Sequence, residues 1–165
     1  MTDKGQVVEE AAIMFERILP VSPEKSWAFL TETARLTEWY GEGNIEPREG
    51  GKVALMGGHI RGVVTGWRPG KFFAHTWNVF SPGETVSAWP VSYLEFALAS
   101  EDASTKLTLT HRPILRSVQH QTMMGWHTFL DMVGAAVRGE TVAPRDTIMQ
   151  KNAALYGVDL NNLIR

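Results

Sequence analysis

A long amphipathic helix that follows a series of β-strands is the feature that most limits the folds open to this chain. At about 100° per residue, residues 123–137 place apolar side chains on one broad stripe: Met123, Trp126, Phe129, Leu130, Val133 and Val137. Since nearly everything between residue 50 and this helix predicts β-strand, one late helix must cover one sheet. This arrangement favours a binding cavity between helix and sheet over a solid core.

The strands are predicted from β-rich composition and period-two alternation. They cover residues 13–20, 52–56, 60–67, 72–79, 91–99 and 106–112. Glycine, proline and acidic turn residues separate the later ones, and such short links join antiparallel neighbours. Apolar residues alternate along the strands, so one face of the sheet is expected to be apolar and the other mixed.

Helix signals flank the strands. Ser22 is a good N-cap and Pro23 suits the first helical position, which predicts a short helix after the first strand. A second short helix is expected over residues 35–40. Gly139 is a plausible stop for the long helix, and residues 144–156 predict a further helix with Gly157 as its C′ residue.

Length and composition favour one globular domain. With 165 residues and 44% hydrophobic content, we expect a flexible segment over residues 1–12, a single domain over 13–139 and a helical extension over 140–165. The chain has no cysteine, which excludes disulfides, thiolate nucleophiles and sulfur-ligated metals. A net charge of −2 without a Lys/Arg cluster disfavours a nucleic-acid partner.

No apolar run reaches the length of a signal peptide or a membrane span. We therefore expect a cytoplasmic protein with no membrane span. It would be a monomer, or a homodimer paired through its C-terminal extension.

Several motifs, in order, resemble the family related to the activator of heat-shock-protein-90 ATPase. Over residues 13–138 they are Glu16-Arg17, Pro23-Glu24-Lys25-Ser26-Trp27, Leu30-Thr31, Leu36, Trp39-Tyr40-Gly41, Gly50-Gly51-Lys52, Gly62-x-Val64, Pro69, Phe73, Trp77, the run 105–111 and Gly125-Trp126. The resemblance implies the α+β helix-grip fold of START, pollen-allergen-like and other SRPBCC proteins. That fold has a curved antiparallel sheet of six or seven strands around a long C-terminal helix, with two short helices after the first strand.

The resemblance says less about function, because one fold serves many tasks. Co-chaperone activity belongs to larger relatives with an additional N-terminal domain, so we do not carry it over. This chain also departs from the family pattern at His75, where an apolar residue is usual.

The candidate ligand-binding site consists of residues predicted to lie between sheet and helix. They are Trp39, Val53, Leu55, Phe73, His75, Trp77, Leu94, Phe96, Leu109, His111, Met123, Trp126, His127 and Leu130. Apolar walls with a few polar groups are typical of small-molecule sites. His75, His111 and His127 are the polar groups, and a ligand carbonyl, hydroxyl or carboxylate could bond to them.

Metal and catalytic sites find little support in the sequence. His120 and His127 lie seven residues apart, unlike the i, i+4 pair of a zinc-binding helix, and no carboxylate is expected beside His75 and His111. The chain has no Gly-x-Ser-x-Gly motif. We therefore assign no metal, cofactor or catalytic residue.

Three functions stay open. The leading prediction is non-catalytic binding of a hydrophobic or aromatic small molecule. A chaperone- or stress-related protein-interaction module is the first alternative. The second is a hydrolase- or cyclase-type enzyme acting on a small hydrophobic substrate, in which one of the three histidines would act as acid or base.

Overall fold

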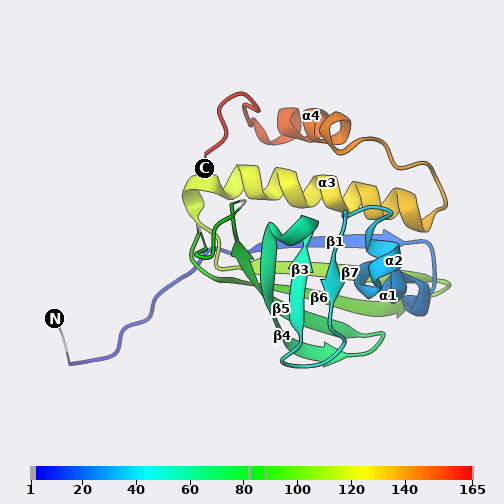
Figure 1. Ribbon diagram of the computed structural model, residues 1–165, viewed down its shortest axis with the longest axis horizontal. Helices are drawn as coiled ribbons and strands as arrows, with labels where there is room; N and C mark the ends of the chain where they lie inside the picture. Colours follow the sequence, from blue (N-terminus) through cyan, green and yellow to red (C-terminus); the bar gives the residue numbers. More distant parts are fainter. Residues whose placement is uncertain (1–2, 82, 88, 165) are drawn as a thin grey trace.

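The computed structural model describes residues 3–81, 83–87 and 89–164 and contains a seven-stranded antiparallel sheet (Figure 1). In chain order the strands are β1 (Ile13–Leu19), β2 (Asn44–Ile45), β3 (Lys52–Leu55), β4 (Ile60–Arg68), β5 (Phe72–Val79), β6 (Ser92–Glu101) and β7 (Ser104–Arg112). Their spatial order is β1-β7-β6-β5-β4-β3-β2. The first strand thus pairs with the last, and the others form a continuous meander.

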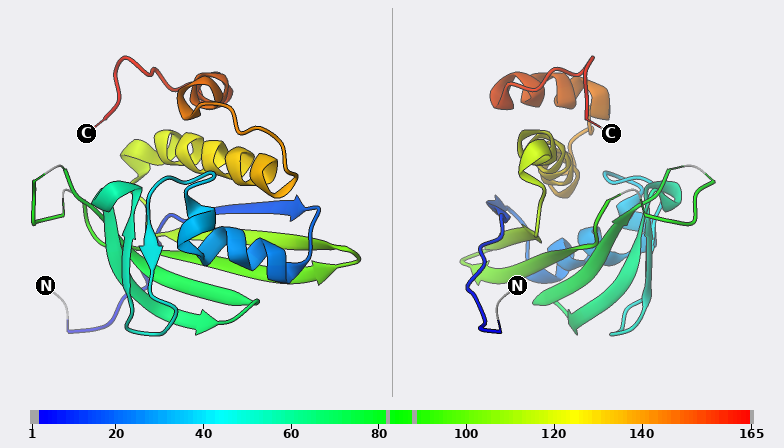
Figure 2. Two further views of the ribbon diagram at one scale, coloured as in Figure 1. Left: turned by 45° about the vertical axis from the view of Figure 1, so that its right-hand side comes forward. Right: turned by 90° about the vertical axis from the view of Figure 1, so that its left-hand side faces the viewer.

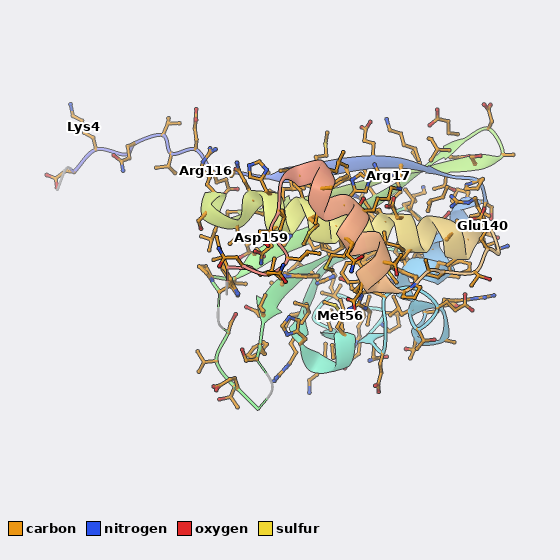
Figure 3. The ribbon with its side chains drawn as sticks, turned by 90° about the horizontal axis from the view of Figure 1, so that it is seen from above. Lys4, Arg17, Met56, Arg116, Glu140 and Asp159 are labelled. Atoms are coloured by element: carbon orange, nitrogen blue, oxygen red, sulfur yellow. The ribbon has the colours of Figure 1, made fainter. Side chains whose placement is uncertain are left out.

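Within the described residues, four α-helices accompany the sheet. They are α1 (Pro23–Thr31), α2 (Thr33–Leu36), α3 (Gln119–Val137) and α4 (Arg145–Tyr156), with short 3-10 turns η1 (Met56–Gly58) and η2 (Arg116–Val118). The sheet curves, α3 runs across it, and α4 packs on the side of α3 away from the sheet (Figure 2). Seen from above, α4 crosses over α3 (Figure 3).

The predicted α+β helix-grip architecture is confirmed. Ser22 caps α1 by accepting a hydrogen bond from the Lys25 backbone N–H at 3.2 Å, and Gly157 ends α4 in the left-handed region at φ 66°. Three details differ from the sequence predictions. Strand β2 was not expected because two residues carry no periodicity, α2 is shorter and earlier than residues 35–40, and α3 begins at Gln119 instead of Met123.

The core lies between the concave face of the sheet and α3. Leu94 and Phe96 of β6 and Leu107 and Leu109 of β7 are buried, as their alternation predicts. The strand register places His75 opposite Leu94, and Leu94 opposite His111. The two histidines therefore lie in one row across the sheet, separated by a leucine.

Gly62 lies where strands β4 and β5 approach each other closely. A Cβ atom added there would collide with the backbone carbonyl oxygen of Thr76 on the neighbouring strand β5. Close approach of two backbones is a common reason for glycine inside a strand. Any larger residue must therefore push β4 and β5 apart.

We predict that Gly62→Ala lowers the free energy of unfolding by more than about 2 kcal/mol, because the sheet must distort to admit one methyl group. Urea denaturation followed by circular dichroism measures the change. Val63→Ala is the matched control on the same strand: this side chain is 46% exposed, so its loss should cost less than about 1 kcal/mol. Equal effects of the two substitutions would contradict the steric account.

Candidate functional site

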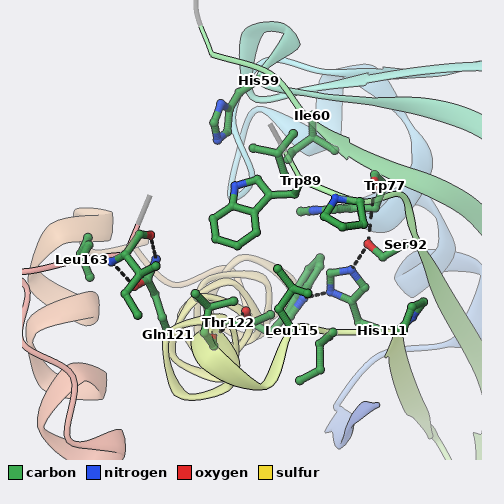
Figure 4. A pocket seen from close by; sticks show the side chains of 18 of the residues that line it. His59, Ile60, Trp77, Trp89, Ser92, His111, Leu115, Gln121, Thr122 and Leu163 are labelled. Atoms are coloured by element: carbon green, nitrogen blue, oxygen red, sulfur yellow. Dashed lines mark hydrogen bonds between the residues drawn. The ribbon is translucent and has the colours of Figure 1, made fainter. Parts of the chain in front are cut away.

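A cavity of about 530 Å³ lies where α3 begins, between the helix and the sheet (Figure 4). Strand β5 contributes Trp77 and Val79, and α3 contributes Gly125, Trp126 and Phe129. Residues near η1, the segment leading into β6, the segment around η2 and the C-terminal tail complete the wall. The site thus gathers parts of the chain that lie far apart in the sequence.

Aromatic rings form much of the inner wall. The centroids of Trp77 and Trp126 are 5.1 Å apart, and Trp77 lies 5.3 Å from the imidazole of His111. Trp89, in the segment before β6, lies across the cavity from the labelled tail residue Leu163 (Figure 4). Such rings offer large apolar faces to a flat ligand.

A short chain of hydrogen bonds lies at the deep end of the cavity. The Trp126 indole N–H donates to His111 Nδ1 at 3.0 Å, and His111 Nε2 is 2.7 Å from the Ser92 hydroxyl oxygen. An indole nitrogen can only donate, so Nδ1 carries no proton. A neutral imidazole then has its proton on Nε2, and His111 donates to Ser92.

Burial keeps this imidazole neutral. Burial, with a smaller contribution from nearby His75, lowers the pKa of His111 from 6.5 to about 4. Protonation would also place an N–H on Nδ1, facing the indole N–H of Trp126. Burial likewise lowers the pKa of His75 to about 4, against the opposing effect of its hydrogen bond to the Thr76 carbonyl oxygen at 2.9 Å.

The C-terminal tail forms part of the wall. The Gln121 side-chain amide donates to the Ile164 carbonyl oxygen, and the Ile164 backbone N–H donates to Gln121 Oε1, both at 3.0 Å. This pair fixes the tail beside the first turn of α3. Leu163 and Ile164 consequently line the cavity.

The comparison with protein families agrees with this architecture. The model of the family described as Activator of Hsp90 ATPase homolog 1-like protein matches residues 20–138. The chain belongs to this family. No curated protein matches it.

Several solved structures have a similar fold. The crystal structure of CalU16 from Micromonospora echinospora is 22% identical, with a TM-score of 0.70 over 88% of this chain and 85% of that one. PFC0360w, an HSP90 activator from Plasmodium falciparum, is 23% identical, with a TM-score of 0.66 over 78% and 96%. DynU16, a protein in the dynemicin biosynthetic locus, is 17% identical, with a TM-score of 0.68 over 81% and 50%. At these identities the likeness concerns the fold alone.

Three of the predicted site residues line the cavity: Trp77, His111 and Trp126. Nine others are buried elsewhere in the core, namely Trp39, Val53, Leu55, Phe73, His75, Leu94, Phe96, Leu109 and Leu130. Met123 is half-buried on α3, outside the lining. A ligand-binding role stays a prediction for all of them.

His127 lies away from the other two histidines. Its Nδ1 is 2.8 Å from the Tyr156 hydroxyl of α4, and its ring packs edge-on against Phe15 of β1. Burial lowers its pKa, an effect that Asp131 opposes. Of the three histidines that were expected to share one cavity, His111 lines it. His75 is buried in the core, and His127 contacts α4.

Sequence reasoning missed Ser92, Trp89, Gly125 and the tail residues as parts of the site. Ser92 begins a strand, where alternation alone could have placed it beside Leu94 and Phe96. Trp89 and Leu163 lie in irregular segments, whose path no periodicity predicts. In the described residues, no three His, Asp or Glu side chains come close enough to hold a metal ion, and none of the helices has the length and hydropathy of a membrane crossing.

We predict that the free energy of unfolding falls as pH drops from about 6.5 to 4. The two buried histidines bind protons at about pH 4 when folded but near 6.5 when unfolded, so in that window the unfolded state takes up more protons. Each histidine contributes roughly 3 kcal/mol to the change. Urea denaturation at several pH values measures it.

His75→Leu should remove about half of this pH dependence while leaving neutral-pH stability largely intact, because leucine suits the buried apolar position. The exposed His120→Gln is the control and should behave as the unmodified protein does. An unchanged pH dependence in His75→Leu would contradict the assignment.

Proposed function

We propose that this protein binds a hydrophobic or aromatic small molecule, without catalysis, in the cavity between α3 and the sheet. The observation that carries this proposal is the cavity of about 530 Å³ faced by Trp77, Trp89 and Trp126. Its volume falls within the ~300–1,000 Å³ typical of ligand sites, which are mostly apolar with a few polar groups. The fold shared with DynU16, a protein in the dynemicin biosynthetic locus, is consistent with a small-molecule role.

The protonation of His111 supports binding over hydrolysis. A histidine that activates a serine must present an unprotonated nitrogen to the hydroxyl. Here the nitrogen beside Ser92 carries the proton, because Trp126 occupies the other one. The distance between Ser92 and His111 is that of a catalytic pair, but the proton on Nε2 prevents His111 from acting as a base toward Ser92. The two residues are instead suited to holding a polar group of a ligand in a fixed position.

Gly125 gives a direct test, because a Cβ atom added there meets nothing within 4 Å and the residue lines the cavity. We predict that Gly125→Leu places a side chain inside the cavity and weakens binding of anilinonaphthalene sulfonate at least tenfold. The folded state should not lose stability, since replacing an interior helix glycine gains up to ~1 kcal/mol. Fluorescence titration and thermal denaturation measure the two effects.

Gly134→Ala is the matched control on the same helix. It gains helix propensity outside the cavity, and only the flexible end of Arg138 lies near the new methyl group, at 3.3 Å. This variant should bind the probe as the unmodified protein does. Undiminished binding to Gly125→Leu would refute the cavity as the binding site.

A chaperone-related interaction is the second candidate function. It is favoured by membership of the Activator of Hsp90 ATPase homolog 1-like family and by the fold shared with the HSP90 activator from Plasmodium falciparum. A cytoplasmic location, as we propose, would place the chain with such a partner. We connect a role in stress response with this chaperone-related function and not with small-molecule binding.

For this candidate we predict complex formation with a bacterial Hsp90 homologue and a measurable rise in its ATPase rate. Gly125→Leu serves as a discriminating variant, because a surface interaction should survive the narrowing of the cavity. Size-exclusion chromatography and a coupled ATPase assay provide the readouts. Absence of a complex together with an unchanged ATPase rate would eliminate this function.

A further inference from the structure

The hydroxyl of Ser92 donates only a long hydrogen bond within the described part of the protein. Its oxygen accepts the Nε2–H of His111 at 2.7 Å, so the hydroxyl hydrogen must point elsewhere. Among the described residues, the acceptor for this hydrogen is the Trp77 backbone carbonyl oxygen at 3.5 Å. That distance is well beyond the ~2.7–2.8 Å usual between hydroxyl donors and oxygen acceptors.

Three other polar side chains of the lining already have hydrogen-bond partners within the protein. The Thr122 hydroxyl donates to the Val118 carbonyl oxygen at 2.9 Å, and the Gln121 amide holds Ile164. His59 Nδ1 is bonded to the Phe80 carbonyl oxygen at 2.8 Å. Ser81 lies exposed at the rim. Ser92, which is 6% exposed, is therefore the buried hydroxyl among the described lining residues with a proton to donate.

The chain of hydrogen bonds from Trp126 through His111 makes the Ser92 hydroxyl a stronger hydrogen-bond donor. A hydroxyl that accepts a hydrogen bond becomes a better donor, because the bonds polarise one another. Trp126 fixes the protonation of His111, and His111 in turn occupies one lone pair of Ser92. His111 thus acts as a positioning residue that turns Ser92 toward donating.

We infer that the cavity selects flat aromatic molecules bearing a hydrogen-bond acceptor, such as an aryl ketone, whose oxygen receives the Ser92 proton while its rings lie against Trp77. This inference rests on the proposed binding function and names the ligand class for the same site. Trp77 and His111 flank the hydroxyl, with ring centroids 5.3 Å apart. A ketone oxygen there would replace the long contact to the Trp77 carbonyl with a short one.

Fluorenone and fluorene test the inference, because the two have nearly the same shape and only fluorenone has a carbonyl. The unmodified protein should bind fluorenone about 3- to 10-fold more tightly than fluorene, as one neutral hydrogen bond permits. Ser92→Ala should abolish the preference by lowering the affinity for fluorenone to that for fluorene. Ser92→Thr, which retains the hydroxyl, should keep it. Chemical-shift titration gives the affinities.

Two spectroscopic readouts separate a donor role from a merely structural one. The infrared carbonyl stretch of bound fluorenone should shift to lower frequency in the unmodified protein and not in Ser92→Ala. Nitrogen NMR of the His111 ring should show a protonated Nε2 and a bare Nδ1. A proton on Nδ1, or an equal preference in the unmodified protein and Ser92→Ala, would overturn the inference.

The possible failures are distinguishable. If both compounds bind with equal affinity in every variant, the cavity binds apolar rings and only the Ser92 role fails. If neither compound binds, the proposed function fails and the inference fails with it.

Discussion

The hydrogen bond from Trp126 to His111 connects the parts of this structure that matter most. Trp126 is nearly fully buried and connects α3 with His111 of β7 at the deep end of the cavity. The same bond places the proton of His111 on Nε2. Ser92 therefore accepts a hydrogen bond from His111 and has its own hydroxyl proton free to donate. Packing of the helix on the sheet and the chemistry of the cavity therefore depend on one indole ring. Loss of that ring would leave a void in the core and would also remove the hydrogen bond that fixes the protonation of the His111 imidazole.

Much of the architecture could be predicted from the sequence because its signals are periodic. Alternation in β6 and β7 and the apolar stripe of α3 each repeat several times, so single exceptions do not hide them. The caps at Ser22 and Gly157 work through local geometry, which sequence also carries. By contrast, Asn44–Ile45 pairs as β2 only because β3 lies beside it, and two residues form no pattern.

The candidate site was harder to predict because it depends on where irregular segments end in space. His127 and Trp126 are adjacent in sequence, yet a step of about 100° sends one toward α4 and the other toward the sheet. The buried stripe is wide enough that its edge could not be located from periodicity. Trp89 and Leu163 come to the cavity through segments without regular structure. Alternation predicts which residues point inward. It does not predict whether the inward side chains are large enough to fill the space or leave a cavity.

The tail beside the cavity has a consequence for comparisons within the family. The family match ends at residue 138, whereas Leu163 and Ile164 supply part of the cavity wall and are tied to Gln121 by two hydrogen bonds. Two relatives with closely similar domains could therefore enclose differently shaped spaces if their tails differ. Ligand preference in such proteins would diverge through a segment that family membership does not describe, and it cannot be transferred from one relative to another by the shared domain alone.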